Sequence, residues 1–397
     1  MRFAMRFLIG ATVVLAPVNA PAQNDPAALV KDVAGNKPTI ELVFVIDTTG
    51  SMGGLIDGAK QKVWNIVNEV MKSPSKPEVR MGLVAYRDHG DAYVTQVTPI
   101  TRNLDSVYNT LMAYKADGGG DGPEDVRQAL SDGLRKVGWS ARSGNISQIL
   151  FLVGDAPPHD DYDNEPDTVS TASEAVKAGI LVNTIQCGNM QGTDLAWKKI
   201  SRAGEGQYFA IAQDGGVVAI ATPFDAELSR LGTKIGGTYM AYGGGMASMG
   251  GMAAMSGADF RKNKAAAQRK VEGKVAMAAP AAARADRAYN KAINAAAYDD
   301  NDLIQGIENG TVKLDALKTG ELPDELQKLS AKDRQKVVAE KIEERKKVRL
   351  QILELSKKRD EFLAGERKKQ SAKKQTGFDE AVSETLKAQI TRKGLKP

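Results

Sequence analysis

The chain predicts an α/β fold, namely a doubly wound and mostly parallel sheet with helices on both faces, followed by a C-terminal α-helical region. Two observations carry this prediction. From residue 39 to about 234, short apolar runs alternate with amphipathic stretches, and strands that alternate with helices in this way form parallel sheets. After residue 236 the composition changes, first to Gly, Ala, Met and Ser, and then to long runs of Ala, Lys, Arg and Glu.

Five apolar runs follow the first strand, which is predicted over 40–46. That first run (IELVFVI) is continuously apolar after Glu41, as expected of a central strand that is covered on both faces. The other runs predict strands over 79–86, 92–98, 149–153, 180–185 and 207–210.

Apolar residues at helical spacing predict the helices between these strands. In the first helix, over 55–71, Ile56, Val63, Ile66 and Val70 recur every three to four residues, or multiples of that spacing. Similar patterns predict helices over 104–114, 125–137, 167–178, 193–203 and 217–231. The sheet and its helices therefore account for one domain over 39–234.

The remainder of the chain divides into a linker and a helical region. Residues 235–260 are rich in Gly, Met and Ala and predict a flexible linker. The region 261–397 predicts a helical stretch over 265–297, a helix opened by Pro323, and a long helix from the capping box at Ser330 to about residue 369. Four apolar residues share one face of that long helix: Val348, Ile352, Leu355 and Phe362.

The heptad pattern of the long helix breaks at Arg345 and Arg359. A strict coiled coil needs apolar residues at these spacings. The sequence therefore predicts a helical hairpin or a small bundle there, rather than a long coiled coil.

Charge and cysteine content narrow the functional classes. Of the 54 basic and 49 acidic residues of the chain, 32 and 21 lie in 261–397. The front of the chain is therefore acidic and the back basic, which predicts two units with different surfaces. The single cysteine, Cys187, excludes an intrachain disulfide and lies in an apolar run that is typical of a buried strand.

The first residues resemble a secretory signal peptide. Two arginines precede the apolar run 7–16, and Ala20-Pro21-Ala22 provides small residues for cleavage before Gln23. This pattern predicts a signal peptide over 1–22, a linker over 23–38, and a periplasmic or secreted chain. The run is too short to span a bilayer, and no later run is long enough, so no transmembrane segment is expected in the mature chain. An uncleaved anchor or a disordered tail is the alternative.

Acidic and hydroxyl side chains follow two of the predicted strands. Asp47, Thr49 and Ser51 come directly after the first strand, and Asp155 follows the strand at 149–153. Ligands of open parallel sheets bind beyond the carboxyl ends of the strands, and Mg²⁺ takes oxygen ligands. The pattern therefore predicts a divalent-cation site. The alternative is a strand-to-helix turn in which Thr49 or Ser51 only caps the helix.

The segment 44–52 (FVIDTTGSM) resembles the metal-ion-dependent adhesion site of von Willebrand factor A (VWA) domains, whose pattern is Asp-x-Ser-x-Ser. The resemblance covers 39–234 and implies a VWA fold that holds one Mg²⁺, with Ca²⁺ or Mn²⁺ as alternatives. Thr49 replaces the first serine and keeps its oxygen, and Asp155 matches the aspartate of the third loop.

The threonine that this family carries in the second loop has no evident counterpart. Asp121 and Glu124, in a glycine-rich loop, are the candidates for its place. An acidic ligand there would hold the metal more tightly, or favour Ca²⁺. The segments 82–91 (GLVAYRDHGD) and 118–126 (GGGDGPEDV) are similar to the bacterial branch of the family and to A domains fused to α-kinases, although no kinase segment accompanies them.

The resemblance implies a non-enzymatic, cation-dependent protein-binding module of the cell envelope that acts in adhesion or assembly. An acidic group of a protein partner would complete the metal shell, and the loop acids Asp160, Asp161 and Asp163 would set selectivity. The basic run at 367–374 could contact an anionic surface, whereas export argues against nucleic acid.

Two other interpretations stay open. One is a metal-dependent hydrolase with His159 or Asp160 as the general base. The other is a metal-free scaffold in which the helical tail is the working part.

Overall fold

The computed structural model describes residues 38–73, 75–120, 122–163, 165–216, 220–245, 255–370 and 377–392, with the side chains of 367–370 and 392 excepted. Residues 1–37, which carry the predicted signal peptide and most of the linker after it, lie outside this part, and export stays a prediction. The described residues form one compact unit. Among the helices that are described, none has the length and apolar character needed to cross a bilayer.

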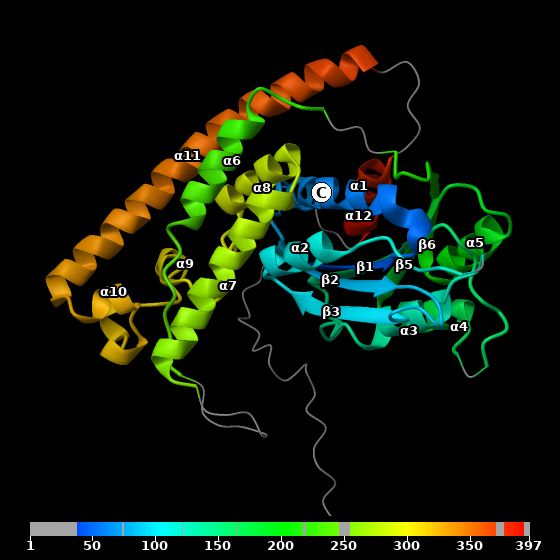
Figure 1. The fold of residues 1–397 in the computed structure, drawn as a ribbon, viewed down its shortest axis with the longest axis horizontal. Helices are drawn as coiled ribbons and strands as arrows, with labels where there is room; N and C mark the ends of the chain where they lie inside the picture. The colour runs from blue at the N-terminus through cyan, green and yellow to red at the C-terminus, as the bar shows by residue number, and fades with distance from the viewer. Residues whose placement is uncertain are drawn as a thin grey trace, which may run out of the picture. The chain divides into compact units, whose positions relative to one another are not determined.

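The domain is built on a six-stranded sheet in the order β3-β2-β1-β4-β5-β6 (Figure 1). Neighbouring strands are parallel except for β3, which pairs antiparallel with β2 at one edge. The predicted mostly parallel α/β fold is thus confirmed. The strands are β1 (Thr39–Asp47), β2 (Glu78–Tyr86), β3 (Thr95–Thr101), β4 (Ile146–Gly154), β5 (Ile180–Cys187) and β6 (Glu205–Ile211).

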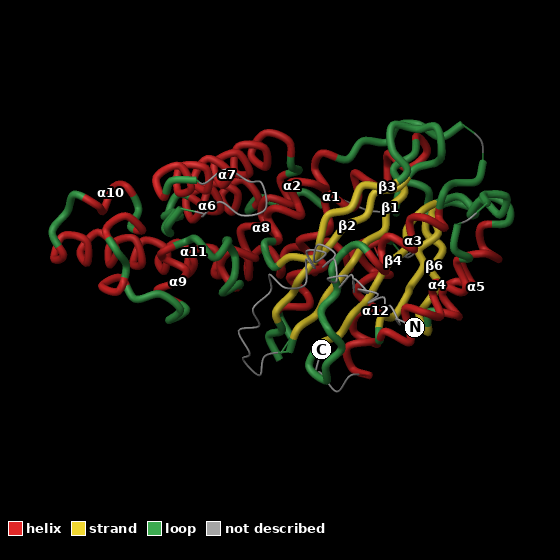
Figure 2. Tube along the Cα trace, turned by 90° about the horizontal axis from the view of Figure 1, so that it is seen from below, coloured by secondary structure: helices red, strands yellow, loops and turns green. Residues whose placement is uncertain are grey.

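Helices cover both faces of this sheet (Figure 2). Successive side chains of a strand point to opposite faces, so Leu42 and Phe44 of β1 pack into one core while Val43 and Val45 pack into the other. The first face is covered by α1 (Gly53–Met71), α2 (Leu104–Ala113) and α12 (Phe378–Arg392). The second is covered by α3 (Val126–Arg135), α4 (Thr168–Ala178) and α5 (Thr193–Ala203).

The helices that follow the sheet have apolar cores of their own. One core joins α6 (Asp225–Gly236), α8 (Ala281–Ile293) and α11 (Ala331–Gln370). A Cβ at Gly232 of α6 would lie 2.9 Å from the Ala288 Cβ of α8, so the glycine allows these two helices to approach closely. The remaining elements are η2 (Gly50–Met52), α7 (Gly257–Ala278), α9 (Leu303–Glu308), η3 (Leu314–Ala316), η4 (Thr319–Glu321) and α10 (Asp324–Gln327).

Several element boundaries differ from those predicted. The helix expected over 217–231 begins only at Asp225, and 217–219 lie outside the described residues. The helical stretch expected over 265–297 is two helices, because Pro280 has no N–H to continue α7 and instead precedes α8. The predicted linker 235–260 includes the end of α6 and the start of α7, whose first turn is capped by Ser256.

The two arginines that interrupt the heptad pattern of α11 are buried. The Arg345 guanidinium donates to Thr238 Oγ1 (2.7 Å) and to Asp302 Oδ2 (2.6 Å). Arg359 donates to Asp225 and Asp286, at 2.7 Å each. Asp225 lies in α6, Asp286 lies in α8, and Asp302 precedes α9. Each arginine of α11 therefore pairs with an acidic residue from another part of the helical bundle.

The last helix, α12, returns to the sheet. Its apolar residues Phe378, Val382, Leu386 and Ile390 join the core on the α1 face. Gln389 exchanges two side-chain hydrogen bonds with Asn183 of β5, at 3.1 and 2.7 Å, and both side chains are buried. The sequence predicted a helical region over 261–397 but did not identify α12 as a separate helix within it.

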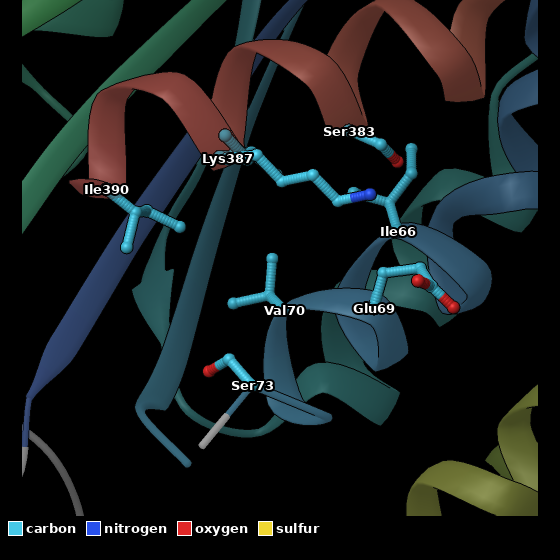
Figure 3. A pocket seen from close by; sticks show the side chains of 8 residues that line it. Ile66, Glu69, Val70, Ser73, Ser383, Lys387 and Ile390 are labelled. Carbon is cyan, nitrogen blue, oxygen red and sulfur yellow. The ribbon is translucent and has the colours of Figure 1, made fainter. Parts of the chain in front are cut away.

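A groove between α1 and α12 lies near the C-terminal end of α1 (Figure 3). Helices rise about 1.5 Å per residue, so Ile66 in the groove lies roughly 20 Å along α1 from its first residue, Gly53. The groove is therefore remote from the sheet edge at Asp47. Its lining residues are Ile66, Glu69, Val70, Ser73, Ser383, Leu386, Lys387 and Ile390.

Replacing Gln389 with alanine is expected to lower the free energy of unfolding by about 1–2 kcal/mol, because the buried Asn183 amide would lose a partner. Urea unfolding followed by circular dichroism measures the change. Glu384→Ala, at an exposed position of the same helix, is the control and should stay within about 0.5 kcal/mol of the wild type. Equal losses in both variants would contradict the docking of α12 on β5.

Candidate metal centre

The predicted site lies where two neighbouring strands end. Asp47 is the last residue of β1, and Asp155 directly follows β4. The register pairs Ile46 with Val153, so both carboxylates reach the same edge of the sheet. The chain order changes direction here, since β1 lies between β2 and β4. Such a switch point is where open α/β sheets bind ligands.

The two carboxylate oxygens of Asp47 have different surroundings. Oδ1 accepts hydrogen bonds from the backbone N (2.8 Å) and Oγ1 (2.7 Å) of Thr49. Oδ2 is buried and has no hydrogen-bond partner. Burial, with a smaller contribution from the adjacent carboxylate of Asp155, raises the pKa of Asp47 from 3.8 to about 7, although the hydrogen bonds from Thr49 oppose the rise. One oxygen thus fixes the strand-to-helix turn, and the other is left for a ligand.

Asp155 is held by a residue that the sequence did not indicate. Its Oδ2 accepts a hydrogen bond of 2.5 Å from Gln213 Nε2, in the loop after β6. The same amide donates to the Ser51 carbonyl oxygen at 3.3 Å. Ser51 itself is exposed, in the short helix η2. Gln213 therefore ties together the two loops that carry the predicted ligands, and no local pattern marks it.

Glu124, one of the two candidates in the second loop, reaches the site. Its side chain is buried, and Oε2 has no hydrogen-bond partner. Burial, together with the negative charges of Asp47 and Asp88, raises the pKa of Glu124 to about 9, although a hydrogen bond with Thr49 opposes the rise. Asp121, the other candidate, lies outside the described residues.

Glycines leave room for this group of carboxylates. A Cβ at Gly154 would lie 2.4 Å from the Tyr86 hydroxyl and 3.2 Å from Asp47 Oδ2. Gly119, whose φ is +81°, packs against Thr49 and Glu124, and a Cβ there would lie 3.4 Å from Glu124 Oε1. Any larger residue at 154 would push into the space beside the unpartnered Asp47 oxygen.

The residues beneath the site are buried and protonated. Burial raises the pKa of the Tyr86 hydroxyl and that of the Cys187 thiol well above their usual values, and the charges of Asp47 and Asp155 add to both shifts. Cys187 is a buried strand residue, as predicted. Its thiol is therefore not in the reactive thiolate form at neutral pH.

These residues suit a hard divalent cation. Asp47 Oδ2 and Glu124 Oε2 are buried carboxylate oxygens without hydrogen-bond partners, and carboxylates buried without compensation are unfavourable. The Thr49 and Ser51 hydroxyls and the Asp155 carboxylate lie on the adjoining loops, and all these donors are oxygens, as Mg²⁺ and Ca²⁺ prefer.

The two histidines, far apart in sequence, come together beside this group. The rings of His89 and His159 stack on those of Tyr162, each at 4.2 Å between centroids. The Tyr162 hydroxyl donates to both oxygens of Asp88, at 2.7 and 2.8 Å. His159 is buried, with Nδ1 2.8 Å from Asp161 Oδ1 and Nε2 3.4 Å from Asp88 Oδ2. Asp160, Asp161 and Asp163 are exposed on the same loop.

Comparison with known proteins points to one family. Residues 41–223 match the family model described as von Willebrand factor A domain. The VWA domain-containing protein 7 of Homo sapiens is 36% identical over 125 residues, which are 32% of this chain and 13% of that protein. The α-protein kinase vwkA of Dictyostelium discoideum is 26% identical over 121 residues, which are 30% of this chain and 19% of that protein. This chain thus matches less than a fifth of the length of either relative.

Solved structures that match part of this chain include BatB of Bacteroides thetaiotaomicron, at 18% identity and a TM-score of 0.33, covering 44% of this chain and 90% of that one. The SpRpn10 VWA domain is 15% identical with a TM-score of 0.33, covering 44% of this chain and 89% of that one. The family match coincides with the sheet, its helices and the carboxylates at the sheet edge. Residues 41–223 of this chain therefore form a von Willebrand factor A domain.

Proposed function

We propose that this VWA domain is a cation-dependent protein-binding module, in which Mg²⁺ is held by Asp47, Thr49, Ser51 and Asp155. VWA domains in general mediate protein–protein interaction. The observation that carries the proposal is the buried, unpartnered Oδ2 of Asp47 beside Asp155 at the switch point of the sheet. A cation at that point offsets the charge of both carboxylates.

The same arrangement supports capture of an acidic group from a partner. The two hydroxyl ligands are neutral, so they leave positive charge on the ion, and a partner carboxylate can take an open position on it. Glu124 is the second-loop residue that reaches the metal site, and its negative charge would tighten metal binding and weaken the attraction to the partner. The exposed acids Asp160, Asp161 and Asp163 would then select among partners by repulsion.

Calorimetric titration of Mg²⁺, Ca²⁺ and Mn²⁺ into the metal-stripped full chain tests the metal site. Saturable one-site binding is expected for the wild type. Binding weakened by more than about 100-fold is expected for Asp47→Ala, since a direct ligand is lost. Asp57→Ala is the matched control, because Asp57 is exposed on α1 with 73% of its side chain accessible, and it should bind as the wild type does.

The partner step has a separate test. The immobilised chain is expected to retain a binding partner from an envelope extract in Mg²⁺ and to release it in EDTA, and Asp47→Ala should not retain it. Metal binding without any Mg²⁺-dependent capture would refute the adhesion step alone. An Asp47→Ala variant that binds Mg²⁺ like the wild type would refute the metal site itself.

A further inference from the structure

We propose that the domain holds a second divalent cation, of the Zn²⁺ class, between His89, Asp125 and Glu165. The three side chains come from three different loops, after β2, before α3 and before α4. His89 Nε2 lies 3.3 Å from Asp125 Oδ2 and 3.1 Å from Glu165 Oε1. All three candidate ligand atoms lie within 4.8 Å of one another. Ligands about 2.0–2.2 Å from a common Zn²⁺ are roughly 3.0–3.5 Å apart, which agrees with the two measured separations.

Both carboxylates present buried oxygens without hydrogen-bond partners. Asp125 is fully buried, and its Oδ1 accepts the hydrogen bond that caps α3, from Gln128 N at 2.8 Å. Its Oδ2 makes no hydrogen bond and faces His89. Glu165 is 10% exposed, and its Oε2 is also buried without a hydrogen bond. Two carboxylates this close repel each other when both are ionised. A divalent cation bound between them would offset that repulsion.

Contacts within the chain hold the candidate ligands in position. The Arg127 guanidinium donates to the carbonyl oxygens of Tyr162, Glu165 and Pro166, which fixes the loop that presents Glu165. The His89 ring stacks on Tyr162 at an angle of 6°, which sets its plane so that Nε2 faces the two carboxylates. A preorganised ligand set of this kind lowers the entropy lost on metal binding.

One side of the site is open to solvent, because half of the His89 side chain is exposed. Three protein ligands with an open position are typical of Zn²⁺ sites that bind water or an external ligand. An imidazole nitrogen together with carboxylates favours Zn²⁺, Mn²⁺ or Co²⁺ over Mg²⁺, which prefers oxygen alone. This separates the site chemically from the all-oxygen set around Asp47.

The two sites are neighbours and use different side chains. Glu124 interacts with Thr49 and Asp47, whereas the adjacent Asp125 faces His89 and Glu165. The second site therefore does not depend on the proposed Mg²⁺ site. Variants of one should leave the ion of the other in place.

Titration of Zn²⁺ into the metal-stripped full chain, in the presence of saturating Mg²⁺, tests the proposal. One Zn²⁺ per chain is expected, with affinity lowered by at least about 30-fold in His89→Ala and in Glu165→Gln. Asp57→Asn, at an exposed position of α1 outside both sites, should bind Zn²⁺ as the wild type does. Thermal unfolding in EDTA shows that each variant remains folded.

Co²⁺ gives a second readout. Its visible absorption spectrum reports the ligands directly, and the spectrum of the wild type should change when His89 is replaced. No stoichiometric Zn²⁺ binding by the wild type would overturn the proposal. Equal Zn²⁺ affinity and equal Co²⁺ spectra in the wild type and His89→Ala would overturn it as well, since the ion would then lie elsewhere.

Discussion

Replacing Arg345 with alanine is expected to lower the free energy of unfolding by about 3–5 kcal/mol, because it leaves a buried charge without its partner. The side chains of Arg345 and Asp302 are both fully buried, and 2.6 Å separates Nη1 from Oδ2. The guanidinium also donates to Thr238 and lies 4.9 Å from the centre of the Tyr298 ring. The substitution removes all these contacts at once, and Asp302 has no other cation at that distance among the ion pairs of the described residues.

Urea unfolding of the full chain measures this loss. Arg230→Ala is the control, since the Arg230–Glu227 pair on α6 is exposed and closes a contact of 2.6 Å between residues three apart. Exposed pairs of this kind contribute about 0–1 kcal/mol, so the control should unfold almost as the wild type does. An Arg345→Ala variant within about 1 kcal/mol of the wild type would show that water reaches Asp302 and replaces the guanidinium.

Arg345 also shows which features can be predicted from the local sequence and which cannot. The long helix could be predicted because its capping box and its apolar residues lie within one segment. The partners of Arg345 and Arg359 could not, since Asp302 and Asp225 lie 43 and 134 residues away. From the local sequence alone, a charged residue at an apolar position of the heptad pattern indicates that the helix packing is interrupted there. In this protein the bundle instead buries an ion pair at that position.

The candidate sites divide in the same way. Asp47 and Asp155 could be identified because each directly follows an apolar strand, and the ends of parallel strands share one edge. No local pattern predicts the contact of Gln213 with Asp155. The same holds for the contacts of His89 with Asp125 and Glu165, because loops from three parts of the chain make them. Strand ends can be predicted from a local pattern, whereas contacts between loops depend on the whole topology.

The tail shows a third case. The spacing of Phe378, Val382, Leu386 and Ile390 is that of an amphipathic helix, so the helix itself was within reach of the sequence. What no spacing reveals is the surface that covers its apolar face. The structure places that face against α1 and the sheet, in the main core of the domain.

Asp47→Asn is expected to stabilise the metal-free protein at pH 8 and to abolish its stabilisation by Mg²⁺. In the folded chain, burial raises the pKa of Asp47 from 3.8 to about 7. The folded state therefore binds a proton more tightly than the unfolded state does. The contribution of Asp47 to stability is therefore largest below pH 4 and is lost as the pH rises through 7, by at most about 4 kcal/mol, since one pKa unit corresponds to about 1.36 kcal/mol. Asparagine cannot ionise and avoids this loss.

The amide also suits the position. The side-chain oxygen of an asparagine here can accept the two hydrogen bonds from Thr49 that Asp47 Oδ1 accepts now, and its NH₂ group can donate toward Asp155. Urea unfolding at pH 5 and pH 8, in EDTA and in saturating Mg²⁺, measures both effects. Asp57→Asn, at an exposed position, should follow the wild type throughout.

Both expected effects, on the stability without metal and on the response to Mg²⁺, depend on Oδ2 of Asp47. For the wild type at pH 8, Mg²⁺ at about 100 times its dissociation constant should add about 2.7 kcal/mol, because the ion relieves the buried charge of Asp47. Asp47→Asn has no such charge, so Mg²⁺ should leave its stability unchanged. A variant that is less stable than the wild type at pH 8 in EDTA would show that Oδ2 is already satisfied without metal. A variant that Mg²⁺ stabilises equally would place the ion elsewhere. Both results are expected together only if the buried Asp47 carboxylate is unfavourable alone and favourable with a cation. Its replacement by asparagine then raises the stability of the metal-free protein and removes the response to Mg²⁺.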